Sequence, residues 1–256
     1  MTTSLTNKIA LVTGASRNIG IGAAIARELA AGGANLFITY YRPYDSTVGV
    51  AAQPTEAEAL LAELRQMGVR AEGLELDLGE PDAPQRLFDA VEARLGPVDI
   101  LVNNAAHSEH DGIDRLDAAL LDRHYRLNVR GMALLCAEFV RRFRGESGRI
   151  INMSSGQGVG PMPGELAYAA TKGAVEAFTV SLSAEEGRRG ITVNAVDPGA
   201  TDTGWMTPEL KAELAAAAAL GRVGEPLDAA RLVRFLASAE AGFITGQVIH
   251  SRGGLW

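Results

Sequence analysis

Tyr168 and Lys172 have the spacing of a proton-transfer pair. They stand four positions apart at the start of a segment with helical periodicity, so their side chains share one face of a helix. A free phenol titrates near pH ~10, which is too high for acid–base catalysis at neutral pH. A cation about 4 Å away would stabilise the phenolate by ~4 kcal/mol at an effective dielectric constant near ~20. That is at most about three pKa units, enough to bring the phenol near pH ~7.

Ser155 supplies the third group of the predicted site. It precedes Tyr168 by thirteen positions and stands at the carboxyl end of the expected fifth strand, residues 149–153. A serine hydroxyl beside the phenol could hold a carbonyl oxygen while a proton moves. The alternatives are that Ser155 caps a helix, and that Tyr168 is a core aromatic and Lys172 a surface charge. The electron donor must come from elsewhere in the chain.

The start of the chain predicts a dinucleotide site. A short apolar run, Ile9–Val12, is followed by a glycine-rich turn, residues 13–22, and by the helical pattern of residues 23–31. A strand, a glycine-rich turn and a helix start place backbone N–H groups and a positive helix end against a pyrophosphate. Glycines permit the tight turn and the close approach of phosphates. The alternative is that the turn needs its glycines for geometry only.

The end of the second strand bears on the choice of cofactor. Asn35–Tyr40 reads as this strand, and Tyr41 and Arg42 follow it without the acidic residue that usually takes a ribose 2′-hydroxyl. Arg17 in the first turn and Arg42 could pair a 2′-phosphate bidentately. The sequence therefore favours NADP(H) over NAD(H), unless Arg42 is simply a solvated loop residue.

Strands and helices alternate along the chain with mostly short connections. This alternation predicts an α/β Rossmann fold: a single domain, residues 1–256, with one doubly wound, seven-stranded parallel sheet and helices on both faces. Expected strands are residues 9–12, 35–40, 70–76, 98–102, 149–153, 191–196 and 244–249. Expected helices are residues 23–31, 55–67, 81–95, 116–143, 168–184 and 228–237. Residues 43–54 form a long polar connection, and residues 201–220, with Trp205 and Met206, a mobile lid over a ligand.

Composition excludes several classes of protein. The chain has 256 residues, 47% of them hydrophobic and 21% charged, with a net charge of −7, which disfavours a nucleic-acid or anionic-membrane partner. Cys136 is the only cysteine, so no intrachain disulfide and no cysteine metal cluster can form, and we expect it in the core. The first eight residues lack an apolar signal core, and the longest apolar run, residues 214–220, is too short for a bilayer. We therefore expect a cytoplasmic protein.

One polar cluster could be mistaken for a metal site. His107, Glu109, His110 and Asp111 follow the fourth strand within five positions. They lack the helical or hairpin spacing of metal ligands, so we expect no metal and interpret them as a solvated rim at the substrate entrance.

These motifs, in this order, resemble the short-chain dehydrogenase/reductase family over essentially the whole chain. Within it the chain is most similar to the 3-oxoacyl-[acyl-carrier-protein] reductases. The matching stretches are Thr13-Gly14-Ala15-Ser16-Arg17, Gly20-Ile21-Gly22, Asp77-Leu78, Asn103-Asn104-Ala105-Ala106, Asn128, Ser155, Tyr168 with Lys172, Asn194, Pro198-Gly199, Thr203 and Ile244-Thr245-Gly246-Gln247.

Four features depart from the family pattern. The glycine turn carries two extra residues, Asn18 and Ile19, and Ala106 stands where the family usually has glycine. Arg252 precedes the final glycine pair, where an acidic residue is frequent, and the connection of residues 43–54 is longer than typical.

The resemblance implies a role for each catalytic candidate. Tyr168 would be the general acid in carbonyl reduction, and Lys172 would lower its pKa and contact the nicotinamide ribose. Ser155 would hold the substrate oxygen, and Asn128 would position a water that links Lys172 to solvent, unless Asn128 is only a capping residue. The implied cofactor-binding residues are Gly14, Ser16, Arg17, Gly20, Ile21, Gly22, Tyr41, Arg42, Asp77, Leu78, Asn104, Ala105, Ala106, Tyr168, Lys172, Pro198, Gly199, Thr201 and Thr203.

The resemblance also implies a reaction and an assembly. We expect an NADP(H)-dependent oxidoreductase that reduces a small-molecule ketone, such as a 3-oxoacyl thioester, to a secondary alcohol, or runs the reverse. The alternatives are an alcohol dehydrogenase for a steroid, sugar or secondary metabolite, and a non-catalytic dinucleotide sensor. The helix after Tyr168 is apolar around much of its circumference, which indicates a subunit contact, and family members are usually homotetramers.

Overall fold

Seven parallel strands form one sheet in this computed structural model, which describes residues 4–45 and 55–255. Their order across the sheet is β3-β2-β1-β4-β5-β6-β7. Successive strands are added on one side of β1 up to β3 and on its other side from β4 onward, so the strand order reverses between β1 and β4. The predicted seven-stranded parallel sheet is confirmed. The strands are β1 (Ile9–Val12), β2 (Asn35–Tyr40), β3 (Ala71–Glu75), β4 (Ile100–Asn103), β5 (Gly148–Met153), β6 (Ile191–Asp197) and β7 (Val248–His250).

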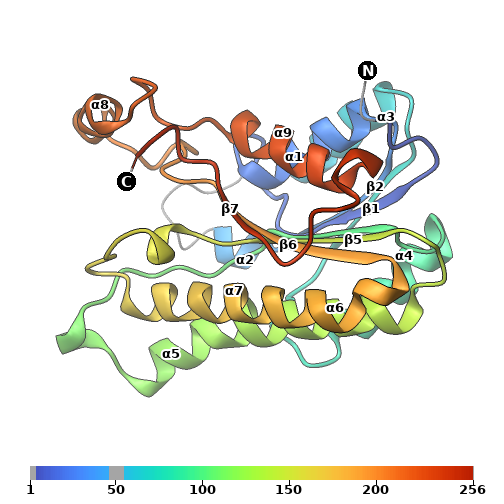
Figure 1. Ribbon diagram of the computed structural model, residues 1–256, viewed down its shortest axis with the longest axis horizontal. Coiled ribbons are helices and arrows are strands. Elements are labelled where there is room, and N and C mark those ends of the chain that lie inside the picture. The colour runs from blue at the N-terminus through green and yellow to red at the C-terminus, as the bar shows by residue number, and fades with distance from the viewer. Residues whose placement is uncertain (1–3, 46–54, 256) are drawn as a thin grey trace.

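Helices cover both faces of this sheet, as expected for a doubly wound fold (Figure 1). One layer contains α1 (Ile21–Ala31), α3 (Glu56–Gln66) and α9 (Pro226–Ala237). The opposite layer contains α4 (Ala83–Arg94), α5 (Ala118–Tyr125), α6 (Met132–Arg142) and α7 (Leu166–Glu186). Two short helices, α2 (Arg42–Asp45) and α8 (Pro208–Ala217), follow β2 and β6.

The alternation of side chains along each strand builds two hydrophobic cores. In β1, Ala10 and Val12 face the core shared with α1 and α9, whereas Ile9 and Leu11 face the core shared with α4 and α6. All four side chains are buried, which is typical of a parallel sheet covered on both faces. Cys136 lies in the second core with no exposed surface, as predicted, and burial raises the pKa of its thiol to about 12.

The predicted helix 116–143 is interrupted in the structure. Between α5 and α6 lies η2, a π-helical turn that spans Arg126–Gly131 and contains Asn128. A Cβ on Gly131 would lie 2.7 Å from the carbonyl oxygen of Leu78, so the close approach of η2 to the turn after β3 requires glycine there. Wider turns of this kind are frequent at functional sites.

Two other segments differ from their predictions. The last strand begins at Val248 instead of residue 244, because Gly246 has a left-handed φ of 70° and turns the chain before the strand. Of the expected connection 43–54, the structure shows α2, and residues 46–54 lie outside the described residues. None of the described helices is both long enough and apolar enough to cross a membrane.

Candidate active site

The turns after β1 and β4 are joined to each other at the carboxyl edge of the sheet. The hydroxyl oxygen of Thr13 accepts hydrogen bonds from the backbone N–H groups of Asn104 and Ala105, both at 3.0 Å. In return, the side-chain amide of Asn104 donates to the carbonyl oxygens of Thr13 and Gly14, both at 2.9 Å. These bonds fix two neighbouring turns at the point where the strand order reverses, which is where doubly wound sheets bind their ligands.

Gly14 and Gly22 are required by this packing. Gly14 has a left-handed φ of 71°, and a Cβ there would lie 2.7 Å from Cα of Ala105. A Cβ on Gly22 would lie 2.5 Å from the carbonyl oxygen of Gly14. The helix start therefore stands directly against the turn. The arrangement fits a pyrophosphate at the first amides of α1, so the turn can hold the diphosphate of a dinucleotide.

The two arginines of the predicted 2′-phosphate site are engaged elsewhere. Arg42 forms an ion pair with Glu75 at the end of β3, and this pairing raises the pKa of Arg42. Arg17 donates to the carbonyl oxygen of Thr203 at 3.3 Å. Between them the hydroxyl oxygen of Ser16 accepts from the backbone N–H of Tyr41 at 3.4 Å. A 2′-phosphate at this place would have to share the Arg42 guanidinium with Glu75.

The turn after β3 is held by η2. Asp77 accepts from the backbone N–H of Gly79 at 2.8 Å and forms an ion pair with Arg126. Arg130 donates to the carbonyl oxygen of Gly79 at 2.6 Å. The predicted adenine-contacting residues Asp77 and Leu78 are thus attached to the same helical turn that carries Asn128.

Tyr168 and Lys172 lie one helical turn apart at the start of α7. The Lys172 ammonium lies 5.4 Å from the centroid of the Tyr168 ring, whose side chain is half-buried. Lys172 is only 4% exposed and donates to the carbonyl oxygen of Met153 at 2.7 Å. Burial lowers the pKa of Lys172 to about 8. The predicted face of the helix therefore carries both groups, with the cation beneath the phenol ring.

Ser155 lies two residues beyond Met153, where β5 ends. Because Lys172 bonds to Met153, the end of β5 and the first turns of α7 are held together. Ser155 has extended backbone angles and forms no side-chain capping bond with the short helix η3 (Gly156–Gly158) that follows, so the capping alternative is wrong. Its half-buried hydroxyl belongs to the same edge of the sheet as Tyr168.

Asn128 connects three segments around the site. Its Oδ1 accepts from the backbone N–H of His107 at 2.7 Å, and its Nδ2 donates to the carbonyl oxygen of His107 at 2.8 Å. The same Nδ2 donates to the Thr171 hydroxyl at 3.0 Å, and Thr171 donates to the carbonyl oxygen of Tyr168 at 2.7 Å. Asn128 is 2% exposed, so it is neither a solvent-facing residue nor a simple cap. It ties η2 to the turn after β4 and to α7.

The prediction of a solvated rim was wrong for Asp111. Asp111 is 9% exposed, and its carboxyl group accepts from the first two backbone N–H groups of α7, those of Leu166 at 2.6 Å and Ala167 at 2.7 Å. Asp111 therefore fixes the start of the helix that carries Tyr168. Sequence reasoning missed this role because capping residues usually directly precede their helix, and Asp111 reaches α7 from 55 positions away.

Replacing Asp111 by alanine is expected to lower the free energy of unfolding by about 1–3 kcal/mol, because two buried N–H donors lose their acceptor. Urea unfolding followed by circular dichroism measures this change. The matched control is Asp114→Ala, because Asp114 lies three positions away and is exposed. Its loss should leave the free energy of unfolding within about 0.5 kcal/mol of the wild-type value. Equal stability of the two variants would contradict the assigned role of Asp111.

Of the other residues in the predicted polar cluster, His107 and Glu109 pair locally, and His110 is exposed as expected for a rim residue. His107 contacts Glu109 at 2.7 Å between Nε2 and Oε1, and Arg123 also binds Glu109. The Arg123 guanidinium is the main cause that lowers the pKa of Glu109 to about 2, and burial lowers the pKa of His107. Within residues 4–45 and 55–255, no three His, Cys, Asp or Glu side chains are grouped so that they could hold a metal ion.

The segment after β6 completes the edge. Thr201 donates to the carbonyl oxygen of Pro198 at 3.0 Å, and the indole N–H of Trp205 donates to the carbonyl oxygen of Thr201 at 2.9 Å. Trp205 is 52% exposed, and Met206 is half-buried. These contacts shape the start of the segment that leads into α8, which projects from one end of the molecule in Figure 1.

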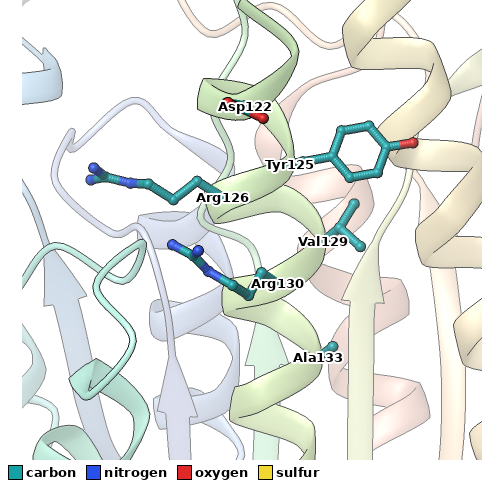
Figure 2. Close-up of a pocket in the computed structure, with 6 residues that line it drawn as sticks. All are labelled: Asp122, Tyr125, Arg126, Val129, Arg130 and Ala133. Atoms are coloured by element: carbon teal, nitrogen blue, oxygen red, sulfur yellow. The ribbon is translucent and has the colours of Figure 1, made fainter. Parts of the chain in front are cut away.

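A surface hollow of about 420 Å³ lies beside these elements on the outer side of α5 and η2. Its lining residues are Asp122, Tyr125, Arg126, Val129, Arg130 and Ala133. In Figure 2 the two arginines point to one side of the helix and Tyr125 and Val129 to the other. None of the catalytic candidates lines it, so we place the active site at the carboxyl edge of the sheet and not in this hollow.

Comparison with known proteins decides the family. The family model described as Enoyl-(Acyl carrier protein) reductase matches residues 14–256, and the solved structure of a short chain dehydrogenase from Burkholderia cenocepacia J2315 in complex with NADP is 35% identical with a TM-score of 0.88, covering 98% of both chains. The chain belongs to the short-chain dehydrogenase/reductase family. It is therefore an NAD(P)-dependent oxidoreductase.

Two curated relatives add detail within this family. The chain is 50% identical to the uncharacterized oxidoreductase YjdA of Bacillus subtilis (strain 168) over 96% of each chain. It is 36% identical to the 3-oxoacyl-[acyl-carrier-protein] reductase FabG of Staphylococcus epidermidis over 98% of this chain and 99% of the relative. The family resemblance read from the sequence is confirmed.

Proposed function

We propose that this short-chain dehydrogenase/reductase reduces a ketone, such as a 3-oxoacyl thioester, to a secondary alcohol with NADP(H), and catalyses the reverse reaction when the alcohol is supplied. The observation that carries the proposal is the buried ammonium of Lys172 beneath the ring of Tyr168, bonded to Met153, which ends β5 two residues before Ser155. A general acid, a cation that tunes it and a hydroxyl donor meet at the edge where such sheets bind dinucleotides.

Each side chain has one task in this mechanism. The Ser155 hydroxyl donates to the substrate oxygen and orients the carbonyl, while Tyr168 transfers its phenolic proton to that oxygen. The positive charge of Lys172 stabilises the phenolate that remains, so the proton leaves Tyr168 at a lower cost. A bound nicotinamide would supply the hydride to the carbonyl carbon. The protein contributes alignment and the proton.

Asn128 acts in this proposal by holding segments in place. Its side-chain oxygen and nitrogen are engaged with His107 and Thr171. A water between Lys172 and solvent, as the family resemblance implies, would then be held by main-chain atoms of the π-helical turn. Asn128 would set the position of that turn relative to α7.

A preference for NADP(H) rests on the end of β2. Tyr41 and Arg42 stand there without an acidic side chain in the position that takes a ribose 2′-hydroxyl, and Arg17 lies in the preceding turn. Two similar structures, at 35% identity each, are described as complexes, one with NADP and one with NADPH. Glu75 competes for Arg42, so we expect a moderate preference for the phosphorylated cofactor.

Two kinds of relatives bear on the substrate class: curated proteins similar in sequence and a solved structure similar in fold. The FabG proteins at 36% identity are 3-oxoacyl-[acyl-carrier-protein] reductases. A structure at 38% identity and TM-score 0.87 is the promiscuous reductase LugOII, which catalyses keto-reduction at C1 during lugdunomycin biosynthesis. A ketone intermediate of a biosynthetic pathway for a secondary metabolite is therefore the second candidate. A pure dinucleotide sensor is disfavoured because it would not need a phenol paired with a buried lysine.

A panel of ketones tests the proposal. Purified protein is mixed with NADPH or NADH and with a 3-oxoacyl thioester, a secondary-metabolite ketone, a steroid ketone or a keto sugar, and loss of nicotinamide absorbance is followed. The reverse reaction is followed with the oxidised cofactors and the corresponding alcohols. We expect turnover of the thioester, with NADPH favoured over NADH by about 10-fold, as one shared charge-assisted pair would give. Absence of turnover across the panel, with both cofactors and in both directions, would reject the proposal.

We also propose a cytoplasmic homotetramer without a nucleic-acid or membrane partner. Support comes from α7, whose outer face exposes a row of small apolar side chains: Ala170, Ala177, Val180 and Ala184. Tyr125 is 41% exposed at the neighbouring hollow. A second copy of the chain could cover both features.

A further inference from the structure

Arg252 lies between two turns of the proposed active site. Its guanidinium stands against Gly156, next to Ser155, so closely that a Cβ on Gly156 would be 2.3 Å from its Nη1. Its backbone and first side-chain carbons stand against Gly199, where a Cβ would be 3.0 Å from the Arg252 Cα and Cγ atoms. Gly156 follows β5 and Gly199 follows β6, and these strands are hydrogen-bonded neighbours. Arg252 thus separates the serine turn from the turn after β6.

A buried carboxylate holds Arg252 in this place. Asp197 ends β6 and has no exposed surface. Its Oδ2 accepts from Arg252 Nη1 at 3.0 Å and contacts His250 Nδ1 at 2.9 Å, and its Oδ1 accepts from the backbone N–H of Gly199 at 2.9 Å. One carboxylate therefore fixes both the arginine and the turn. Arg252 is also the residue where the chain departs from the family, which often has an acid before the final glycines.

The segment that carries Arg252 reaches a third part of the site. Gly253 accepts at its carbonyl oxygen from the backbone N–H of Leu220 at 3.0 Å, and a Cβ on Gly254 would lie 2.5 Å from the Cβ of Ala219. Residues 219 and 220 end the segment that begins after β6 and includes α8. In Figure 1 this segment, the turn after β5 and the chain after β7 lie at the same end of the molecule.

We propose that Arg252, held by Asp197, is a positioning residue that sets the spacing between Ser155 and the turn Pro198-Gly199, and so aligns the nicotinamide half of the cofactor with the substrate carbonyl. This inference rests on the proposed function. The adenine half would lie at the ends of β1, β2 and β3, whereas the guanidinium of Arg252 donates to Asp197 and to the carbonyl oxygen of Leu255. The two halves of the cofactor should therefore respond differently to loss of the pair.

The experiment compares the whole cofactor with a fragment that lacks nicotinamide. Dissociation constants are measured by calorimetry for NADPH and for 2′-phospho-ADP-ribose, and again for NADH and ADP-ribose. Kcat is measured with the best ketone of the panel. The main variant is Asp197→Asn/Arg252→Met, because removal of Arg252 alone would leave a buried uncompensated carboxylate. Arg252→Lys keeps the charge, and Arg234→Met is the matched control, since Arg234 is a similarly covered arginine paired with Glu28 between α1 and α9.

The double variant should bind NADPH about 10-fold more weakly while binding of the fragment changes less than about twofold, and kcat should fall on the order of 10²-fold, as expected for misalignment near 1 Å. Arg252→Lys should recover part of kcat, and Arg234→Met should match the wild type in all three readouts. Equal weakening of cofactor and fragment would show a merely structural pair and overturn the inference, as would wild-type kcat in the double variant. A wild-type protein that binds neither nucleotide would reject the proposed function and this inference with it.

Discussion

Replacement of Tyr168 by phenylalanine is expected to lower kcat for ketone reduction by about 10²–10⁴-fold, the range that general acid catalysis contributes. Phenylalanine keeps the aromatic ring, so the substitution removes only the phenolic hydroxyl that donates the proton. Because Lys172 retains its bond to Met153, the end of β5 and the start of α7 should keep their positions. The dissociation constant of NADPH should therefore change less than about threefold, a free-energy difference below about 0.7 kcal/mol.

Single-turnover reduction and calorimetric NADPH binding measure the two effects separately. Tyr125→Phe is the matched control, since Tyr125 is 41% exposed and lines the surface hollow, which none of Ser155, Tyr168 and Lys172 lines. It should retain wild-type turnover. If Tyr168→Phe turned over ketones at the wild-type rate, Tyr168 would not be the acid, and the mechanism built on it would have to be abandoned.

The sheet could be predicted from the sequence because its strands are short apolar runs bounded by turn residues. Ile9–Val12 and Ile191–Asp197 are buried along their whole length, which parallel strands require and which leaves a clear pattern. The helices α3 and α4 are bounded by glycine and proline, and their predicted ends lie within two residues of the observed ends. What the apolar pattern could not show was the π-helical turn, since an inserted residue in a helix changes its hydrogen bonds without changing its composition.

The active-site residues were predicted from local motifs, but their supports depend on contacts between distant segments. Tyr168 and Lys172 are four positions apart, so their shared face follows from helical geometry alone. Asp111 bonds to α7 across 55 positions, and Arg252 pairs with Asp197 across 55 positions. Neither distance can be read from a single sequence. Arg42 illustrates the converse: its position suggested a phosphate ligand, and only the fold reveals that Glu75 already binds it.

Lys172 gives the second large effect, and its pH dependence can be stated with its sign. Burial lowers its pKa from 10.5 to about 8, so the ammonium loses its proton as the pH rises through about 8. Since the charge stabilises the Tyr168 phenolate, kcat/KM for reduction should fall above that pH. The unfolded chain binds more protons than the folded one between about pH 8 and the ordinary lysine pKa near ~10.5, so the free energy of unfolding should rise with pH in this window.

Lys172→Met removes the cation but keeps an apolar stem of similar length. We expect kcat to fall by about 10²–10⁴-fold, because the phenol returns toward its ordinary pKa near ~10 and the nicotinamide ribose loses a donor. The variant loses the hydrogen bond to Met153, but it also no longer has to bury a charge, which costs roughly 3 kcal/mol as judged from the lowered pKa. The variant should therefore be at least as stable as the wild type at pH ~7.

Two profiles measured side by side test this account: kcat/KM against pH, and urea midpoints between about pH 7 and about pH 10, the range in which a lysine with this pKa titrates. Relative to Lys172→Met, the wild type should gain stability toward the alkaline end. The buried thiol of Cys136 opposes this gain as the unfolded thiol ionises, but it acts equally in both proteins and cancels in the comparison. Lys211→Met is the control, because Lys211 is 54% exposed and pairs with Asp202 on the surface, so its loss should leave both profiles unchanged. A Lys172→Met protein that keeps the alkaline rise in stability would place the titrating group elsewhere, and one that keeps wild-type turnover would show that the phenol does not need the cation.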